Sequence, residues 1–101
     1  MLDGGYMKIK TYIFEGNDYE LIKNYKDGFE KETVENLVTD YFRDYDYIVG
    51  DWSYGHLRLK GFCDKDNKMF KKINNINELD SYIKENCAYD CRYFVLKKIN
   101  R

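Results

Sequence analysis

The chain contains no proline, one tryptophan, one histidine and three cysteines among its 101 residues. Without proline or low-complexity tracts, nothing marks an internal linker, and the length is typical of one domain. An odd and small number of cysteines does not suit a disulfide framework, so we expect a reducing compartment. No run approaches the roughly 20 apolar residues that span a bilayer, and no signal-peptide pattern is present. We therefore expect one cytoplasmic domain over residues 7–101 without membrane contact, after a disordered lead-in at residues 1–6.

Motifs of fixed spacing for nucleotides, metals or nucleophilic catalysis are also missing. The chain has no glycine-rich phosphate loop and no HExxH, CxxC or GxSxG pattern. These chemistries depend on spacing: a phosphate, for example, is held by consecutive backbone N–H groups that glycine-rich turns expose. We therefore predict no cofactor, and a non-catalytic role is favoured over an enzymatic one.

Tyrosine and charged residues are abundant instead. Eleven tyrosines and six phenylalanines indicate an aromatic core whose rim keeps hydroxyl groups in water. The net charge is only −1, yet residues 1–55 hold 12 acidic and 6 basic side chains, and residues 56–101 hold 6 acidic and 11 basic ones. Either these halves form two solvated surfaces that pack against each other, or the basic half meets an acidic partner.

The apolar periodicity predicts an α+β domain with a single antiparallel sheet and two helices in the order ββαββαβ. Strands are predicted at 9–14, 19–25, 45–51, 56–63 and 92–99, and helices at 30–44 and about 76–86, the latter capped by Asn75. Without its first strand, this order is that of ferredoxin-like folds, which place two helices on one face of the sheet. The last strand is apolar on both faces, so we expect it inside the sheet.

Strand 56–63 has the clearest alternation in the chain, with His56, Arg58, Lys60 and Phe62 on one side and Leu57, Leu59, Gly61 and Cys63 on the other. An open sheet face with these cations and Phe62, joined by Arg92 or Lys98, would suit single-stranded RNA. Lys60-Gly61-Phe62 matches only the start of the RNA-recognition signature, and the net charge supplies little attraction. An ordinary solvated face is the alternative.

The preceding turn, Trp52-Ser53-Tyr54, offers aromatic side chains at a loop tip. Exposed Trp and Tyr are good anchors for a protein partner because they lose little entropy on burial. The alternative is that Trp52 folds back and covers the sheet.

His56 and the cysteines are the remaining candidates for chemistry. His56, Cys63, Cys87 and Cys91 would form a Cys₃His zinc set by count, but His56 and Cys63 leave opposite sides of one strand. We therefore predict no metal site. Cys87 and Cys91 could form a disulfide, although their spacing is not that of a redox dithiol motif. A triad around His56 cannot be built, because no nucleophile can be placed beside it.

The segment Gly50-Asp51-Trp52-Ser53-Tyr54-Gly55, followed by Leu57-Arg58-Leu59-Lys60-Gly61-Phe62, resembles the YutD-like family of small bacterial proteins. The resemblance extends over roughly residues 17–98 and includes Cys87 to Cys91 and Tyr93 to Lys98. Ser53 and His56 stand where the family pattern has Gly and Gln. The resemblance implies a bacterial protein from a family without an assigned activity, so it supplies no catalytic residues.

These observations favour a non-catalytic module that presents the 51–62 hairpin to a protein or an RNA-containing partner. The proposed binding residues are Asp51, Trp52, Tyr54, Arg58, Lys60 and Phe62. The alternative hypothesis is a small thiol-dependent enzyme or redox protein that uses Cys87 and Cys91.

Overall fold

The computed structural model describes residues 9–87 and 89–99, and the lead-in expected at 1–6 lies outside this part of the chain. The described residues form one antiparallel sheet of five strands with two α-helices and three short 3₁₀ turns, in the predicted ββαββαβ order. The strands are β1 (Thr11–Phe14), β2 (Asn17–Tyr25), β3 (Tyr47–Ser53), β4 (His56–Phe62) and β5 (Tyr93–Lys98), and the helices are α1 (Lys31–Leu37) and α2 (Leu79–Asn86).

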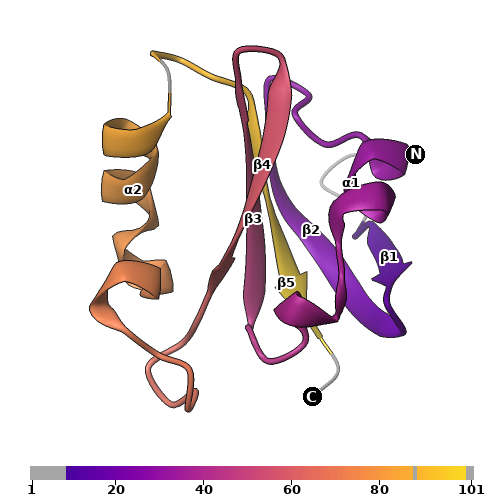
Figure 1. Ribbon diagram of the computed structural model, residues 1–101, viewed down its shortest axis with the longest axis vertical. Helices are drawn as coiled ribbons and strands as arrows, with labels where there is room; N and C mark the ends of the chain where they lie inside the picture. Colours follow the sequence, from indigo (N-terminus) through magenta and orange to yellow (C-terminus); the bar gives the residue numbers. More distant parts are fainter. Residues whose placement is uncertain (1–8, 88, 100–101) are drawn as a thin grey trace, which may run out of the picture.

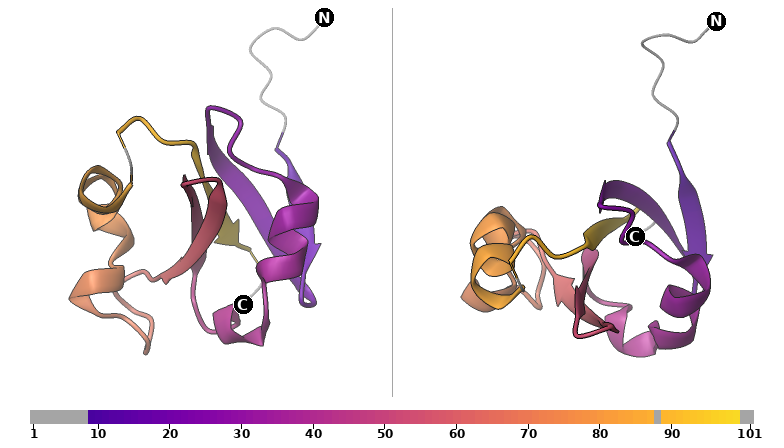
Figure 2. Two further views of the ribbon diagram at one scale, coloured as in Figure 1. Left: turned by 45° about the horizontal axis from the view of Figure 1, so that its top comes forward. Right: turned by 90° about the horizontal axis from the view of Figure 1, so that it is seen from above.

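The strands lie in the order β1-β2-β5-β3-β4, so β5 is central and β4 forms one end of the sheet. The central place of β5 confirms the expectation drawn from its two apolar faces. The helices cover opposite faces of the sheet (Figures 1 and 2). The ferredoxin-like arrangement is therefore wrong, since it would put both helices on one face. The physical reason is that β3 and β5 carry apolar side chains on both sides, and each side needs a helix to exclude water.

The α1 face contains the larger part of the hydrophobic core. Phe14, Tyr19, Ile48, Phe94 and Leu96 from four strands pack there against Val34 of α1 and Phe42 of the following turn. Leu57 and Leu59 of β4 extend this layer to the edge of the sheet.

The α2 face is built around Tyr47, Val49, Phe62, Tyr93 and Val95, which pack against Ile76, Leu79, Tyr82 and Ile83 of the α2 region. No residue of α2 itself is fully buried. This helix therefore covers the sheet with one side while the rest stays in contact with water.

The first helix is shorter than the sequence predicts. It ends at Leu37, Val38 has extended φ and ψ angles, and a 3₁₀ turn follows at Asp40–Phe42. The Thr39 hydroxyl accepts a hydrogen bond from the Tyr41 N–H at 3.3 Å and so caps the new turn. The interruption rotates Phe42 into the core and leaves Tyr41 exposed, whereas an unbroken helix would have put Tyr41 inside.

Candidate functional site

The predicted hairpin forms as strands β3 and β4, joined by Tyr54 and Gly55, which both have positive φ angles. Such a two-residue turn matches the right-handed twist of its strands. Gly55 adopts this conformation without strain, but Tyr54 does so at some cost. The turn therefore holds a bulky aromatic residue in a defined place at the tip of the hairpin.

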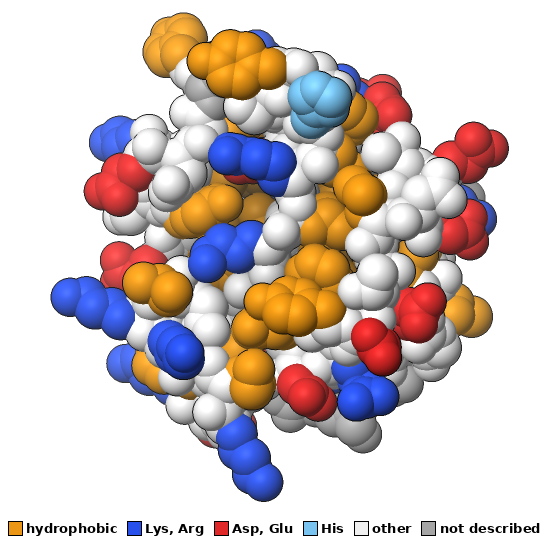
Figure 3. Space-filling model, viewed as in Figure 1, with side chains coloured by type: hydrophobic (Ala, Val, Ile, Leu, Met, Phe, Trp, Pro, Cys, Tyr) orange, Lys and Arg blue, Asp and Glu red, His pale blue; other side chains and the backbone are white. Residues whose placement is uncertain are grey.

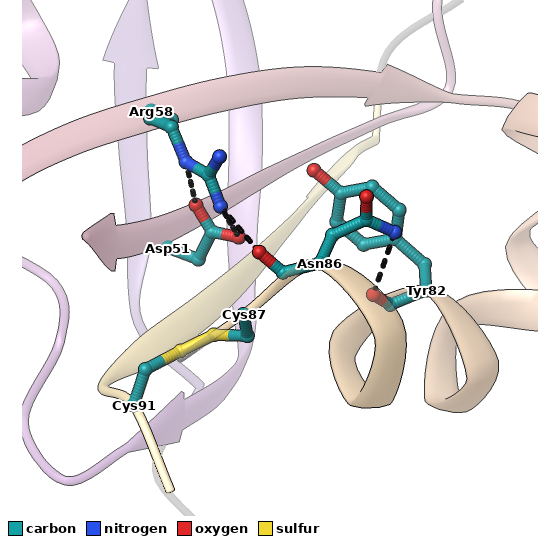
Figure 4. Close-up of polar contacts among 6 residues, drawn as sticks. All are labelled: Asp51, Arg58, Tyr82, Asn86, Cys87 and Cys91. Carbon is teal, nitrogen blue, oxygen red and sulfur yellow. Dashed lines mark hydrogen bonds and ion pairs between the residues drawn. A yellow bond between two sulfur atoms is a disulfide. The ribbon is translucent and has the colours of Figure 1, made fainter. Parts of the chain in front are cut away.

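Asp51 and Arg58 face each other across the hairpin and form the polar centre of the site (Figure 4). The Arg58 Nε and Nη2 atoms each donate to a different carboxylate oxygen of Asp51 at 3.0 Å. Asp51 is 1% exposed, whereas the Arg58 side chain is 47% exposed. Hydrogen bonding to Asp51 raises the pKa of Arg58 above its ordinary value.

Arg58 also connects the hairpin to α2, because its Nη2 donates to the backbone oxygen of Asn86 at 2.8 Å (Figure 4). Asn86 is the last residue of the helix, where unpaired carbonyl groups favour a cation. A donation from the Asn86 side chain to the Tyr82 carbonyl, at 3.1 Å, closes this end of the helix further. Arg58 and Asp51 therefore position α2 against the sheet.

Trp52 is fixed at the base of the tip. Its Nε1 atom donates to the Gly28 carbonyl at 2.7 Å, and the Arg92 guanidinium lies 4.6 Å from the centre of its ring. Arg92 also donates to Glu30 and to the Asp27 carbonyl, both at 3.0 Å. Trp52 thus folds back and stays half-buried, while Tyr54 is 97% exposed and extends into solvent.

The open face that the RNA interpretation requires is absent in this structure, because α2 covers it. Phe62 is 1% exposed and meets the Tyr82 ring edge-on at 5.3 Å between centres. The Lys60 ammonium group lies over both rings, at 5.5 and 5.8 Å from their centres. Phe62 therefore provides no stacking platform, which corrects the sequence-based expectation for this residue. Asp51 is likewise buried, so both residues support the hairpin from within.

The histidine and the three cysteines do not converge. A disulfide joins Cys87 to Cys91, whose Cα atoms are 6.0 Å apart, while Cys63 is free and buried. Cys91 precedes the start of β5 at Tyr93, so the direction of that strand does not separate it from Cys87. His56 is exposed near the tip of the hairpin. Among the described residues, no group of three or more His, Cys, Asp or Glu side chains is placed to hold a metal ion.

Two grooves flank strand β4. The α2 groove has a volume of about 500 Å³ and is lined by residues that include Lys60, Phe62, Ile73, Tyr82 and Asn86. The lysine groove, on the other side of the strand, has a volume of about 430 Å³. Its lining includes Tyr41, Tyr45, Lys60, Lys68, Lys71 and Ile73, with no Asp or Glu among the described residues that form it. The hydrogen bond between the two tyrosine hydroxyls raises the pKa of Tyr45 to about 12, so this phenol is neutral at physiological pH.

Sequence reasoning did not select Tyr82, Asn86, Lys68 or Lys71 for the site. The two lysines come from the loop that follows β4, and the other two residues come from α2. Periodicity assigns each residue to a face of its own element but does not show which element lies opposite. The excess of basic residues after position 56 was the signal for the lysines.

None of the described helices is both long and apolar enough to cross a lipid bilayer.

Comparison with known proteins identifies the family. Residues 13–97 match the family model described as "Putative antitoxin YutD-like". The chain is 46% identical over 89 residues to "Putative antitoxin YutD" of Bacillus subtilis (strain 168), an alignment that covers 88% of this chain and 98% of that protein. The solution NMR structure of protein yutD from B. subtilis superimposes with a TM-score of 0.75 at 44% identity, over 91% of this chain and 84% of that one. The chain therefore belongs to the YutD-like family, as the resemblance of its hairpin segment indicated.

Proposed function

We propose that this chain is a cytoplasmic, non-catalytic protein-binding module that neutralises a protein toxin by direct binding through the 51–62 hairpin. The family description and the name of the B. subtilis relative both contain the word antitoxin. Direct binding is the simplest way in which a small non-catalytic module inactivates another protein.

The exposure of Tyr54 is the observation on which the choice of surface rests. This side chain is 97% exposed, sits on a tight turn and stands above the immobilised Trp52. A rigid aromatic anchor loses little conformational entropy when a partner covers it, which is why Tyr is frequent among residues that dominate binding energy. A protein partner is favoured over RNA because α2 occupies the face on which bases would stack.

Partner capture tests this function. The full chain serves as bait in lysate of the host bacterium with and without nuclease treatment, together with the Tyr54→Asn and Tyr89→Asn variants. Asn followed by Gly suits the two-residue turn, so Tyr54→Asn removes the aromatic ring while preserving the hairpin. Tyr89 is 100% exposed at a different place and provides the matched control.

We expect the wild-type chain and Tyr89→Asn to retain the same protein, and Tyr54→Asn to retain about tenfold less, as for a moderate anchor residue. Expression of the captured protein alone should arrest growth, and co-expression of this chain should restore it. Capture of nothing, capture that nuclease abolishes, or a captured protein without toxicity would each contradict the proposal.

The Cys87–Cys91 disulfide supports a second candidate, thiol–disulfide exchange. In this reaction a thiolate of a dithiol reductant attacks one sulfur of the bridge and forms a mixed disulfide. The reductant's second thiolate then displaces that cysteine, which leaves two reduced cysteines and an oxidised reductant. A catalyst of this type should accelerate the reduction of insulin by dithiothreitol, and Cys87→Ser should abolish the effect. An unchanged rate with the wild-type chain would rule this candidate out.

A further inference from the structure

We propose that the outer edge of β4 receives an extended acidic segment of the partner protein, which pairs with Leu57, Leu59 and Gly61 as an additional strand. This inference rests on the proposed binding function and deepens it, because it specifies the chemistry of the segment that is bound. Tyr54 would mark one end of this edge, and the lysine groove would lie beside it.

The backbone of β4 determines which residues face outward. The Phe62 carbonyl accepts a hydrogen bond from Asp46, next to β3, whereas the Cys63 N–H donates to the Asn74 carbonyl on the opposite side. Because successive residues of a strand direct their backbone groups to alternate sides, Leu57, Leu59 and Gly61 share the outward direction of Cys63.

Within the described residues, β4 pairs only with β3, and its outer edge is covered only at Cys63, by a single parallel bridge to Asn75. The register between β3 and β4 is continuous from Ser53 to Tyr47, without a bulge that would twist the edge away. A row of unpaired N–H and C=O groups on a straight edge is a template for strand addition.

The two grooves give this edge the form of a peptide site. Side chains of an added strand would point alternately to its two faces, so one set would enter the lysine groove and the other the α2 groove. Both grooves include Ile73, which is 73% exposed and lies where either set could contact it. Main-chain pairing would supply affinity, and the grooves would supply specificity.

Charge identifies the occupant as acidic. Lys60, Lys68 and Lys71 line the lysine groove without an acidic residue among its described lining. The α2 groove is mixed, because Glu78 and Glu85 there balance its two lysines. The acidic side chains of the bound segment are therefore those that enter the lysine groove. Figure 3 shows the molecule from the side on which β4 lies, with Lys and Arg side chains along the middle and lower left of the view, beside apolar groups. The backbone of the loop that carries Lys68 and Lys71 is held by Asn74, which accepts from the Lys71 N–H at 2.8 Å and donates to the Met69 carbonyl at 2.9 Å.

A second copy of the chain is a poorer occupant of the same edge. Antiparallel pairing of two β4 strands around Leu59 would place Arg58 of one copy opposite Lys60 of the other. Like charges directly opposite each other destabilise a pair of strands. The same charges attract a strand that carries Asp or Glu.

Amide hydrogen exchange with NMR detection tests the proposal on the full chain. The probe is a synthetic peptide of about eight residues with alternating Glu and Val, capped at both ends and long enough to span the free edge. The control peptide has Lys in place of Glu. Near saturation, the acidic peptide should slow exchange at Leu57, Leu59 and Gly61 about tenfold, because their amides become hydrogen-bonded. Exchange at Arg58 and Lys60, which already face β3, should not change, and the Lys peptide should have no effect.

Charge reversal provides a second measurement. The double variant Lys68→Glu with Lys71→Glu should weaken peptide binding about tenfold, as expected when exposed charges are reversed. Lys31→Glu with Lys97→Glu changes the net charge equally at exposed positions outside the groove and should leave binding nearly unchanged. Both variants should retain the wild-type spectrum outside the mutated sites, which shows that they fold.

Three results would overturn the edge proposal: no protection at any of the three amides, protection that appears with rising protein concentration alone, or binding of an oligouridine probe to the lysine groove when the acidic peptide does not bind. If none of the three amides is protected but a partner is captured in a way that depends on Tyr54, the edge proposal is wrong and the proposed binding function is retained. Failure of partner capture would instead contradict the function itself.

Discussion

On the α1 face, aromatic and aliphatic side chains such as Phe14, Ile48 and Phe94 pack together, and Val34 of the helix is completely buried among them. On the α2 face, the helix has no fully buried residue. It is also fastened by Arg58, by the disulfide that follows it and by the ion pair between Lys26 and Asp90. The α1 face is held by close packing, whereas the α2 face combines shallower packing with a few specific bonds. We expect mutations on the first face to affect the whole fold and mutations on the second to affect mainly the position of α2.

The largest effect should come from the packed face. Phe94→Ala would leave a cavity where its ring now meets Phe29 at 5.3 Å and fills the space above Gly50. We expect the free energy of unfolding to fall by about 3–5 kcal/mol. Urea denaturation followed by circular dichroism measures this loss. If Phe94→Ala lowered the free energy of unfolding by less than Arg58→Ala on the α2 face, the distinction between the two faces would be contradicted.

Arg58→Ala should have the next largest effect, because it leaves the buried Asp51 carboxylate without its partner. Since Arg58 is about half exposed, we expect a loss of about 2 kcal/mol, below the value for a fully buried ion pair. NMR shift changes should concentrate at Asn86 and the end of α2. Asp51→Val combined with Arg58→Val should cost less than Arg58→Ala alone, and an equal or larger cost would show that the unpaired charge is not the cause.

Removal of the disulfide should have a smaller effect. The Cys87–Cys91 bridge closes a short loop, so Cys87→Ser with Cys91→Ser should lower the free energy of unfolding by about 2 kcal/mol or less. Denaturation of the wild-type chain with reductant should reproduce this value. The double variant should not respond to reductant, and any response would implicate the remaining Cys63.

The smallest effect should come from the surface contact of Asp90 with Lys26 and Tyr25, which ties the loop after α2 to β2. Hydrogen bonds from Lys26 and then from Tyr25 lower the pKa of Asp90 below its ordinary value. A lowered pKa in the folded state adds stability above the unfolded-state pKa of about 4, and this contribution disappears as the pH falls through the folded-state value. Asp90→Asn should therefore be slightly less stable than wild type at pH 7 and equal to it in strong acid.

Thermal denaturation across the acidic range measures this difference, with Asp66→Asn as a control for an exposed carboxylate in another loop. A difference in thermal stability between Asp90→Asn and wild type that persists in strong acid would show that the contact does not act through the charge of Asp90.

Local patterns predicted much of the fold. The alternation from His56 to Cys63 predicted that Leu57 and Leu59 lie on one side of the strand and Phe62 on the other, and the structure has this arrangement. Asn75 caps the turn before α2, where its side chain accepts from Asn77. These features depend on neighbours in the chain, and such neighbours can be read from a single sequence.

Other features depended on contacts between distant segments. The break after Leu37 lets Phe42 enter the core in place of Tyr41, and helix periodicity cannot anticipate this exchange. The covering of Phe62 by Tyr82 was also missed, because alternation along β4 does not show which element packs on each of its sides. The apolar character of the last strand on both sides could have indicated that each face carries a helix.

The amino-acid sequence by itself determined the ββαββαβ order, the central place of the last strand and the family, because strand alternation, turn residues and the hairpin motif are local properties. Only the tertiary structure decided that α2 covers the face of Phe62, and that Arg58 pairs with the Asp51 carboxylate and the Asn86 carbonyl. It also decided that the outer edge of β4 lies between two grooves. These outcomes arise where elements far apart in the chain compete to cover the same apolar surface and pair the same polar groups, and that competition is settled only when the whole domain packs.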